Sequence, residues 1–216
     1  MNFHDSRRYL ASGAMNPDDA LCVWCAVAAA VQRPDALRAG VVAAIEQKTP
    51  LLTVYEAILQ TYLFAGFPAG IEGLSVFSEV VREHDANFTP PVAESYNAAL
   101  FAGRGLPLCK TVYGSVFSRM SAAASDMSPD LYSWMIIEGY GKTLSRAGAA
   151  SLTRELCIVG VLAALGWQRQ LFSHIRGAIN VGATAREVRH AVEICAFLSP
   201  NRIEPARETL SEAIGI

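Results

Sequence analysis

The sequence predicts an all-α protein, and three observations lead to that prediction. Apolar residues recur at the three- or four-residue spacing of a helix along almost the whole chain, and strand-like alternation is scarce. Proline separates the periodic segments, as at Asn16-Pro17 and Ser128-Pro129, where helices typically end or start. Hydrophobic residues make up 52% of the 216 residues, which is ample for a buried core. We therefore expect roughly ten helices around that core.

The expected helices follow one another with short connections. Ser151 and Thr184 directly precede helical patterns, and their hydroxyl groups can accept hydrogen bonds from the first free backbone amides. In chain order, the expected helices span residues 18–31, 34–47, 51–65, 69–85, 92–102, 106–123, 129–145, 152–165, 168–181, 186–198 and 203–214.

An internal repeat is predicted from a shift of 134 positions, which carries Leu37 onto Leu171 and Val54 onto Val188 without a gap. Two related helical units are therefore expected. The predicted organisation is an N-terminal extension (1–16), a degenerate first helical repeat (17–86), a helical connector (87–150) and a second repeat that carries a Glu/His motif (151–216).

The Glu/His motif consists of Glu155 and His174, two ionisable residues on the apolar faces of consecutive helices. Such a pair could exchange a proton near neutral pH. In a simple antiparallel hairpin the two would be offset by about 7 Å along the axis. Direct contact would then need a steep crossing, a bridging water or a neighbouring subunit. The alternative is a structural glutamate and a core histidine. In the repeat register their counterparts are Leu21 and Gly40, so packing alone does not require the pair.

The charge balance excludes several classes of protein. Lys and Arg number 18 against 20 Asp and Glu, which is unlike a nucleic-acid-binding protein or a polybasic membrane patch. No apolar run is long enough for a bilayer, and residues 1–14 lack a secretory signal, so we expect a cytoplasmic protein. The five cysteines and four histidines have no metal-site spacing, and no metal is expected.

The segment 152–188, LTRELCIVGVLAALGWQRQLFSHIRGAINVGATAREV, resembles the carboxymuconolactone decarboxylase / alkylhydroperoxidase D-like superfamily. Two further stretches, 139–148 (GYGKTLSRAG) and 56–70 (EAILQTYLFAGFPAG), are similar to the decarboxylase branch. The residues that match the main pattern are Arg154, Glu155, Leu156, Gly166, Gln170, Leu171, His174, Ala178, Gly182, Thr184, Glu187 and Val188.

The resemblance implies an alkylhydroperoxidase D-like helical fold in which Glu155 and His174 form a proton-relay active site. It also implies a homo-oligomer, a trimer or a hexamer. Trp167 and Gln170 stand where the peroxidase branch has its C-x-x-C cysteines, so the chain resembles the decarboxylase branch. The expected activity is that of a cofactor-free carboxy-lyase, acting on a small carboxylate or lactone by decarboxylation, isomerisation or hydrolysis.

Further residues are candidates for binding the substrate. Trp167 and Gln170 are expected to shape the pocket, and Tyr62 to complete a composite site, in which the 62–68 segment of the same or a neighbouring chain faces His174. Arg146 could hold a carboxylate through its guanidinium fork, as could Arg154 and Arg176. The alternative for these arginines is ordinary pairing with Glu138, Glu155 or Glu187.

Two other functions remain open at this stage. Cys22 and Cys25 form a C-x-x-C near a helix start, where a thiol pKa can be lowered, so a peroxidase-like redox protein is one alternative. Their apolar neighbours favour buried, unreactive thiols. The other alternative is a non-catalytic helical assembly module that keeps an ancestral pair.

Overall fold

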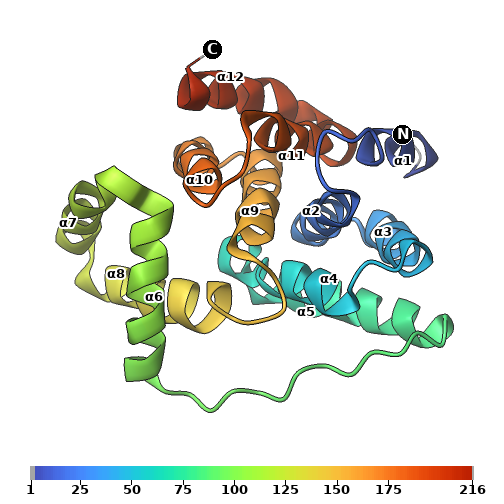
Figure 1. Cartoon of the computed structure of the whole chain (residues 1–216), viewed down its shortest axis with the longest axis horizontal. Coiled ribbons are helices and arrows are strands. Elements are labelled where there is room, and N and C mark those ends of the chain that lie inside the picture. Colours follow the sequence, from blue (N-terminus) through green and yellow to red (C-terminus); the bar gives the residue numbers. More distant parts are fainter. Residues whose placement is uncertain (1–2, 216) are drawn as a thin grey trace.

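The computed structural model describes residues 3–215, which fold into helices without any strand, so the all-α prediction is confirmed (Figure 1). The helices are α1 (Phe3–Leu10), α2 (Pro17–Ala30), α3 (Pro34–Gln47), α4 (Leu51–Leu59), α5 (Tyr62–Glu83), α6 (Ala98–Tyr113), η1 (Gly114–Val116), α7 (Phe117–Met127), α8 (Pro129–Trp134), η2 (Met135–Leu144), α9 (Ser151–Leu165), α10 (Gln168–Asn180), α11 (Ala185–Leu198), η3 (Pro200–Arg202) and α12 (Ile203–Ile214).

Helices α2 and α9 form the centre of the molecule. They pack on each other, α3, α4 and α5 surround α2, and α10, α11 and α12 surround α9 (Figure 1). Helix α1 packs on α2 and α3. Helices α6 to α8 with η2 lie together on one side, and residues 86–97 connect them to α5 without regular structure. No helix within residues 3–215 is long and apolar enough to cross a membrane.

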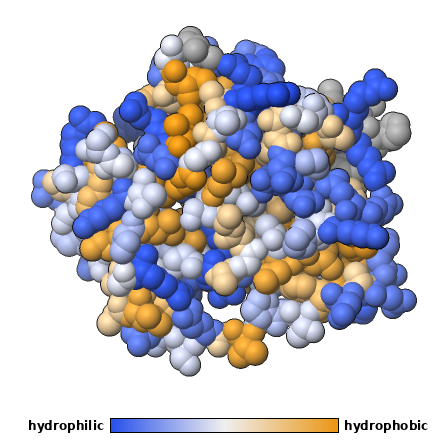
Figure 2. Space-filling view, viewed as in Figure 1, coloured by the Kyte–Doolittle hydropathy of each residue, from blue (hydrophilic) through white to orange (hydrophobic). Residues whose placement is uncertain are grey.

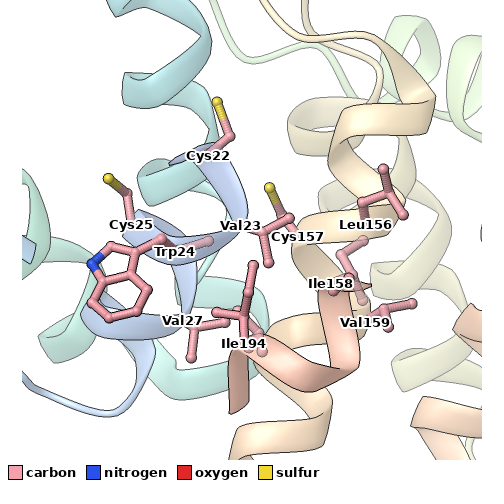
Figure 3. Packing of buried hydrophobic residues seen from close by; sticks show 14 of the residues in the cluster. Cys22, Val23, Trp24, Cys25, Val27, Leu156, Cys157, Ile158, Val159 and Ile194 are labelled. Atoms are coloured by element: carbon pink, nitrogen blue, oxygen red, sulfur yellow. The ribbon is translucent and has the colours of Figure 1, made fainter. Parts of the chain in front are cut away.

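Buried hydrophobic residues of α2 and α9 pack against each other in the core (Figure 3). Val23 and Val27 of α2 are completely buried beside Gly160 of α9. A Cβ atom at Gly160 would lie 2.8 Å from Val23 Cγ1 and 2.9 Å from Val27 Cγ2. Glycine at this position therefore lets the two central helices approach closely, and hydrophobic burial along their full length stabilises the fold.

Helix starts recur at the spacing of the predicted repeat. The first residues of α2, α3 and α4 are Pro17, Pro34 and Leu51, and those of α9, α10 and α11 are Ser151, Gln168 and Ala185. Each pair lies 134 positions apart. At the α2–α9 contact, Thr153 Oγ1 donates a hydrogen bond of 2.7 Å to Asp19 Oδ1, and these two residues are separated by the same 134 positions. The two sets of helices therefore begin in register.

The close crossing of α6 and η2 explains the largest errors in the predicted helices. A helix was expected over 92–102 and another from 106, yet 86–97 is irregular and α6 runs unbroken from Ala98 to Tyr113. A Cβ at Gly105 would lie 2.2 Å from the Ile136 carbonyl oxygen, and one at Gly141 would lie 2.0 Å from that of Phe101. These glycines serve close packing between backbones rather than ending a helix.

Other expected boundaries also differ. The expected helix 51–65 ends at Leu59, and α5 then starts at Tyr62 and kinks at Gly66, whose φ of 85° suits glycine. The stretch expected as one helix over 129–145 is α8 followed by the π-helical η2. Thr184 caps α11 as predicted, with a full capping box, whereas Ser151 is the first residue of α9 and Ala150 precedes it without a side-chain cap.

Candidate active site

Glu155 and His174 meet directly between α9 and α10. His174 Nδ1 lies 2.8 Å from Glu155 Oε2, and the two side chains are 9% and 3% exposed. The axial offset of a simple hairpin is thus overcome within one chain, without a second subunit. Gly177 provides the space: a Cβ there would lie 2.9 Å from Glu155 Oε2 and 2.7 Å from Val112 Cγ1. A side chain at position 177 would displace the carboxylate from the imidazole.

The hydrogen bond assigns different roles to the two imidazole nitrogens. A carboxylate accepts hydrogen bonds, so the bond to Glu155 requires a proton on Nδ1. In the neutral ring Nε2 then carries the lone pair, and the hydrogen bond of the ring within residues 3–215 is the one from Nδ1. The edge of Phe64 from α5 stands against the ring, with centroids 6.0 Å apart at 87°. Nε2 is therefore the nitrogen available for proton transfer.

Protonated tyrosines and a cysteine surround the buried carboxylate. Burial is the main cause that raises the pKa of Tyr140 well above its usual value, and the charges of neighbouring groups, including Glu155, add to it. Burial likewise raises the pKa of Tyr113 and of Cys109 to about 12, and the charge of Glu155 contributes to both. These groups stay protonated at neutral pH, so they do not compete with His174 as a base.

A second buried carboxylate, Glu56 of α4, organises the charges next to this pair. Arg146 binds it with Nε 3.1 Å from both carboxylate oxygens and Nη2 2.9 Å from Oε1. Arg154 Nη2 lies 2.9 Å from Glu56 Oε2, and Arg154 Nη1 donates to Gln60 Oε1 at 3.3 Å. Arg154 and Glu56 are 2% and 0% exposed, so their charges depend on each other. The network joins α4 to the start of α9.

The role of Glu56 was missed in the sequence. Its position was visible in the stretch 56–70, as the first residue of the E-x-x-x-Q pattern that also contains Gln60. Helical periodicity places Glu56 on the buried face of α4, where an unpaired carboxylate would be costly. That signal called for a cationic partner, but the partners come from 90 and 98 positions away along the chain. The alternatives Glu138, Glu155 and Glu187 for Arg146 and Arg154 are wrong, because both bind Glu56.

Tyr62 and Arg146 line one pocket, which neither Glu155 nor His174 lines. The pocket has a volume of about 320 Å³, and the Tyr62 hydroxyl lies 2.7 Å from Thr143 Oγ1 inside it. Lys142 contributes a second cation, paired with Glu138 at 2.6 Å. Apolar residues complete the wall: Tyr55, Leu59, Phe67, Ile71, Leu74, Pro91 and Ala93.

Trp167 and Gln170 lie elsewhere. Trp167 is 56% exposed and precedes α10 at the turn after α9, and Gln170 is exposed on the first turn of α10. Gln170 is one helical turn before His174, whereas Trp167 is nearly two turns away. Neither residue lines the pocket that holds Tyr62 and Arg146. Their assignment to the pocket wall stays a prediction.

The two cysteines of the C-x-x-C lie in the core of α2 (Figure 3). Both side chains are completely buried. Burial raises the pKa of Cys25 to about 12 and that of Cys22 well above its usual value. The thiolate form needed for redox chemistry is therefore disfavoured. Within the part of the chain that the structure describes, no group of three His, Cys, Asp or Glu side chains could hold a metal ion.

Comparisons with known proteins concern the segment that carries the Glu155–His174 pair. Residues 129–203 match the model of the carboxymuconolactone decarboxylase family. Over 73 residues the chain is 31% identical to a 4-carboxymuconolactone decarboxylase of Acinetobacter baylyi, a match covering 34% of this chain and 54% of that protein. The resemblance seen in the sequence is thus confirmed: the segment that matches the carboxymuconolactone decarboxylase family model carries both Glu155 and His174.

A second relative matches nearly the whole chain. Peroxisomal protein 2 of Schizosaccharomyces pombe is 28% identical over 204 residues, which cover 91% of this chain and 92% of that protein. Its name gives a compartment and no activity. The two relatives therefore support the family, and neither fixes a substrate.

Proposed function

We propose that the chain is a carboxymuconolactone decarboxylase-like enzyme that carries out cofactor-free acid/base chemistry on a small organic acid or lactone. The observation that carries this proposal is the buried contact of 2.8 Å between His174 Nδ1 and Glu155 Oε2, inside the family segment. A base held in one tautomer by a carboxylate is suited to move a proton to or from a reacting carbon.

In the proposed reaction the substrate carboxylate leaves as carbon dioxide, and the electron pair of the broken bond is delocalised into a conjugated carbonyl. His174, in its protonated form, gives the Nε2 proton to the resulting carbanion. Glu155 stabilises the imidazolium before this step and keeps Nδ1–H oriented afterwards. Solvent then returns a proton to Nε2. The same pair could serve lactone isomerisation or hydrolysis.

The cations around Tyr62 supply a place for an acidic group. Arg146 uses Nε and Nη2 for Glu56, while no hydrogen bond within residues 3–215 involves its Nη1. A carboxylate in the pocket could accept from this nitrogen and from Lys142. We assign substrate binding to Tyr62 and Arg146 on this basis. Glu155 and His174 do not line this pocket, so the proposed composite site depends on Phe64 of α5, whose ring lies against His174, to connect it with the proton relay.

The matching helix starts support the proposal that the chain contains two related units, 17–86 and 151–216, joined by the connector 87–150. Each unit would then supply what the other lacks: the first unit the buried Glu56, the second unit Glu155 and His174. The contact of Phe64 with His174 joins the two within a single chain.

The direct test is release of carbon dioxide from 4-carboxymuconolactone. We expect turnover by the wild type, a loss of about 10²–10⁴-fold in His174→Ala, and little change in the control His84→Ala. His84 is a suitable control because it lies at the end of α5 and bonds only the Val80 carbonyl. Absence of turnover by the wild type would eliminate this substrate. Equal turnover by His174→Ala would eliminate the proposed role of the imidazole.

A homo-oligomer, a trimer or a hexamer, is part of the proposal. Large apolar side chains are exposed on α7 and α8, with Met127, Leu131 and Trp134 at 74%, 52% and 60% exposure. Clusters of this kind are typical of surfaces that associate. Light scattering after gel filtration should give a mass of three or six chains, and Trp134→Lys should lower it. A monomeric wild type would contradict this part of the proposal.

A non-catalytic assembly module is the second candidate function, and the same exposed apolar residues favour it. Undiminished function in the cell with Glu155→Gln and His174→Ala combined would support it over the enzyme. For the compartment, the cytoplasm stays our proposal, and the peroxisome of the second relative is the alternative. Microscopy of the fluorescently labelled chain beside a peroxisomal marker distinguishes the two.

A further inference from the structure

A second hollow lies between α10 and the α6–α7 hairpin, with a volume of about 590 Å³. This volume is within the range of small-molecule binding sites. α10 packs against α6, and α7 follows α6 after the short turn η1 (Figure 1). The floor is apolar and combines residues of all three helices and η1: Val112, Tyr113, Val116, Met120, Ala123 and Phe172. We refer to this hollow as the α7–α10 groove.

The α7–α10 groove carries positive charge without a matching carboxylate. Arg119 of α7 and Arg176 of α10 line it, and its lining contains neither Asp nor Glu. Neither arginine forms an ion pair with a carboxylate of residues 3–215. Arg176 is held near the floor, since its guanidinium carbon lies 5.9 Å from the centre of the Phe172 ring. In contrast to Arg119 and Arg176, other arginines of residues 3–215 do form ion pairs with carboxylates: Arg7, Arg38, Arg104, Arg146, Arg154 and Arg207.

The groove is separate from the proton-relay pair. His174 turns toward Glu155 on α9, whereas Phe172 and Arg176, each two residues away on α10, project from another part of the helix surface. Val112 stands between the two regions, because it lines the groove and also contacts the space beside Gly177 and Glu155. A molecule in the groove would therefore bind behind this wall and not at Nε2 of His174.

On the viewed face, hydrophobic residues form several separate patches between hydrophilic ones (Figure 2). A hollow with an apolar floor and two guanidinium groups complements a molecule that has an apolar body and an anionic end. The ligand-sized volume favours a small molecule over a flat protein surface.

We propose that the α7–α10 groove binds an organic monocarboxylate with an extended hydrocarbon body, of the class of medium-chain fatty acids. The chain lies along Val116, Met120 and Phe172, and the carboxylate accepts hydrogen bonds from Arg119 and Arg176. This site goes beyond the proposed enzymatic function, since it uses neither Glu155 nor His174.

Titration calorimetry with decanoate tests the proposal. We expect binding of decanoate, and much weaker binding of acetate, which lacks the hydrocarbon body, and of decan-1-ol, which lacks the charge. The double variant Arg119→Met with Arg176→Met should weaken decanoate binding by at least about tenfold. Arg82→Met is the matched control, because Arg82 is exposed on α5 and lies outside the groove. It should bind decanoate as the wild type does.

Two further variants separate the possible outcomes. Phe172→Ser should weaken decanoate binding through the floor, and His174→Ala should leave it unchanged, so loss of the proposed catalysis is distinguishable from loss of this site. Equal binding by the double arginine variant and the wild type overturns the proposal. So does a result in which decanoate fails to bind while the double variant changes the mass of the oligomer, because the groove would then be an interface between copies of the chain.

Discussion

The helix pairs α2–α3 and α9–α10 begin at matching positions but differ in what fills the space between their helices. In α9–α10, Glu155 and His174 form a hydrogen bond there. In α2–α3, Leu21 and Gly40 hold the corresponding positions, and the indole of Trp24 occupies the space. A Cβ at Gly40 would lie 2.6 Å from Trp24 Cδ1. The same helical frame therefore holds either an ionisable pair or an aromatic filler, and only the first can move a proton.

The helices that follow each pair differ in the same way. Glu56 of α4 is completely buried and is bound by two arginines. Its counterpart at the shift of 134 positions is His190 of α11, which is 2% exposed and has no hydrogen-bond partner for either nitrogen among the described residues. His190 instead stacks on Tyr9 of α1, with ring centroids 4.2 Å apart. Helix α4 therefore buries a charged carboxylate that is paired with arginines, whereas α11 buries a histidine ring that stacks on a tyrosine.

Removing Glu56 should have the largest effect on stability. In Glu56→Ala, Arg154 would remain 2% exposed without its carboxylate, so we expect a loss of about 3–5 kcal/mol in the free energy of unfolding. Urea denaturation measures this value. Glu79→Ala is the matched control, because Glu79 pairs with Arg38 on the surface, where such a pair contributes about 1 kcal/mol or less. Similar losses in both variants would contradict the distinction.

Replacing Glu155 with leucine, the residue at the corresponding position of α2, should abolish the chemical difference between the helix pairs. We expect turnover in Glu155→Leu to fall about 10²-fold, because His174 loses the group that orients Nδ1–H and stabilises the imidazolium. Helicity by circular dichroism should be retained. Steady-state assays of carbon dioxide release give the first value, and unchanged turnover would show that the carboxylate has no part in catalysis.

Adding one methyl group at Gly177 tests whether the Glu155–His174 contact, which the α2–α3 pair lacks, depends on the space at this glycine. In Gly177→Ala the new Cβ would approach Val112 Cγ1 and Glu155 Oε2 within 3 Å, so we expect a destabilisation of about 1–3 kcal/mol and lower turnover. Gly139→Ala is the control, because a Cβ there meets no heavy atom within 4 Å. Thermal unfolding and assays of both variants provide the test, and equal behaviour would mean that the space at Gly177 is not limiting.

The smallest effect is expected for the pH dependence caused by His190. Burial, with the nearby charge of Arg186, lowers the pKa of His190. The unfolded chain then binds a proton at a higher pH than the folded chain does, so stability should fall as the pH drops through the usual histidine pKa. His190→Phe should make this part of the curve flatter, whereas His84→Phe should not. Urea unfolding at pH 7.5 and pH 5 measures the difference, and identical slopes for wild type and His190→Phe would contradict it.

Much of the fold could be predicted from local pattern. Helices α3 and α12 have the expected boundaries, and the expected bounds of α9, α10 and α11 differ by no more than one residue, because their apolar periodicity and end residues agree. The pattern failed around α6, where the expected helices 92–102 and 106–123 left a break at 103–105, a stretch that contains Gly103 and Gly105. A glycine in a helix that lets another backbone approach has the same sequence signal as a glycine that ends a helix.

The candidate site, like the fold, could be predicted from local pattern only in part. Glu155 and His174 were predictable, because each interrupts an apolar face and both belong to a recognisable family pattern. Their direct contact was not, since an ideal hairpin geometry separates them along the axis. The partners of Glu56 were not predictable either, because a buried carboxylate signals that it needs a cation without indicating which one.

The sequence by itself determined the helices, the ionisable pair and the family whose model residues 129–203 match. Only the tertiary structure decided that the pair touches, that Glu56 binds Arg146 and Arg154, and that Arg119 and Arg176 face one groove. The physical reason is the distance along the chain over which each kind of interaction acts. Helix formation and apolar periodicity act over a few neighbouring residues, whereas these contacts join different helices, whose distances depend on how closely glycines such as Gly160 and Gly177 let them approach.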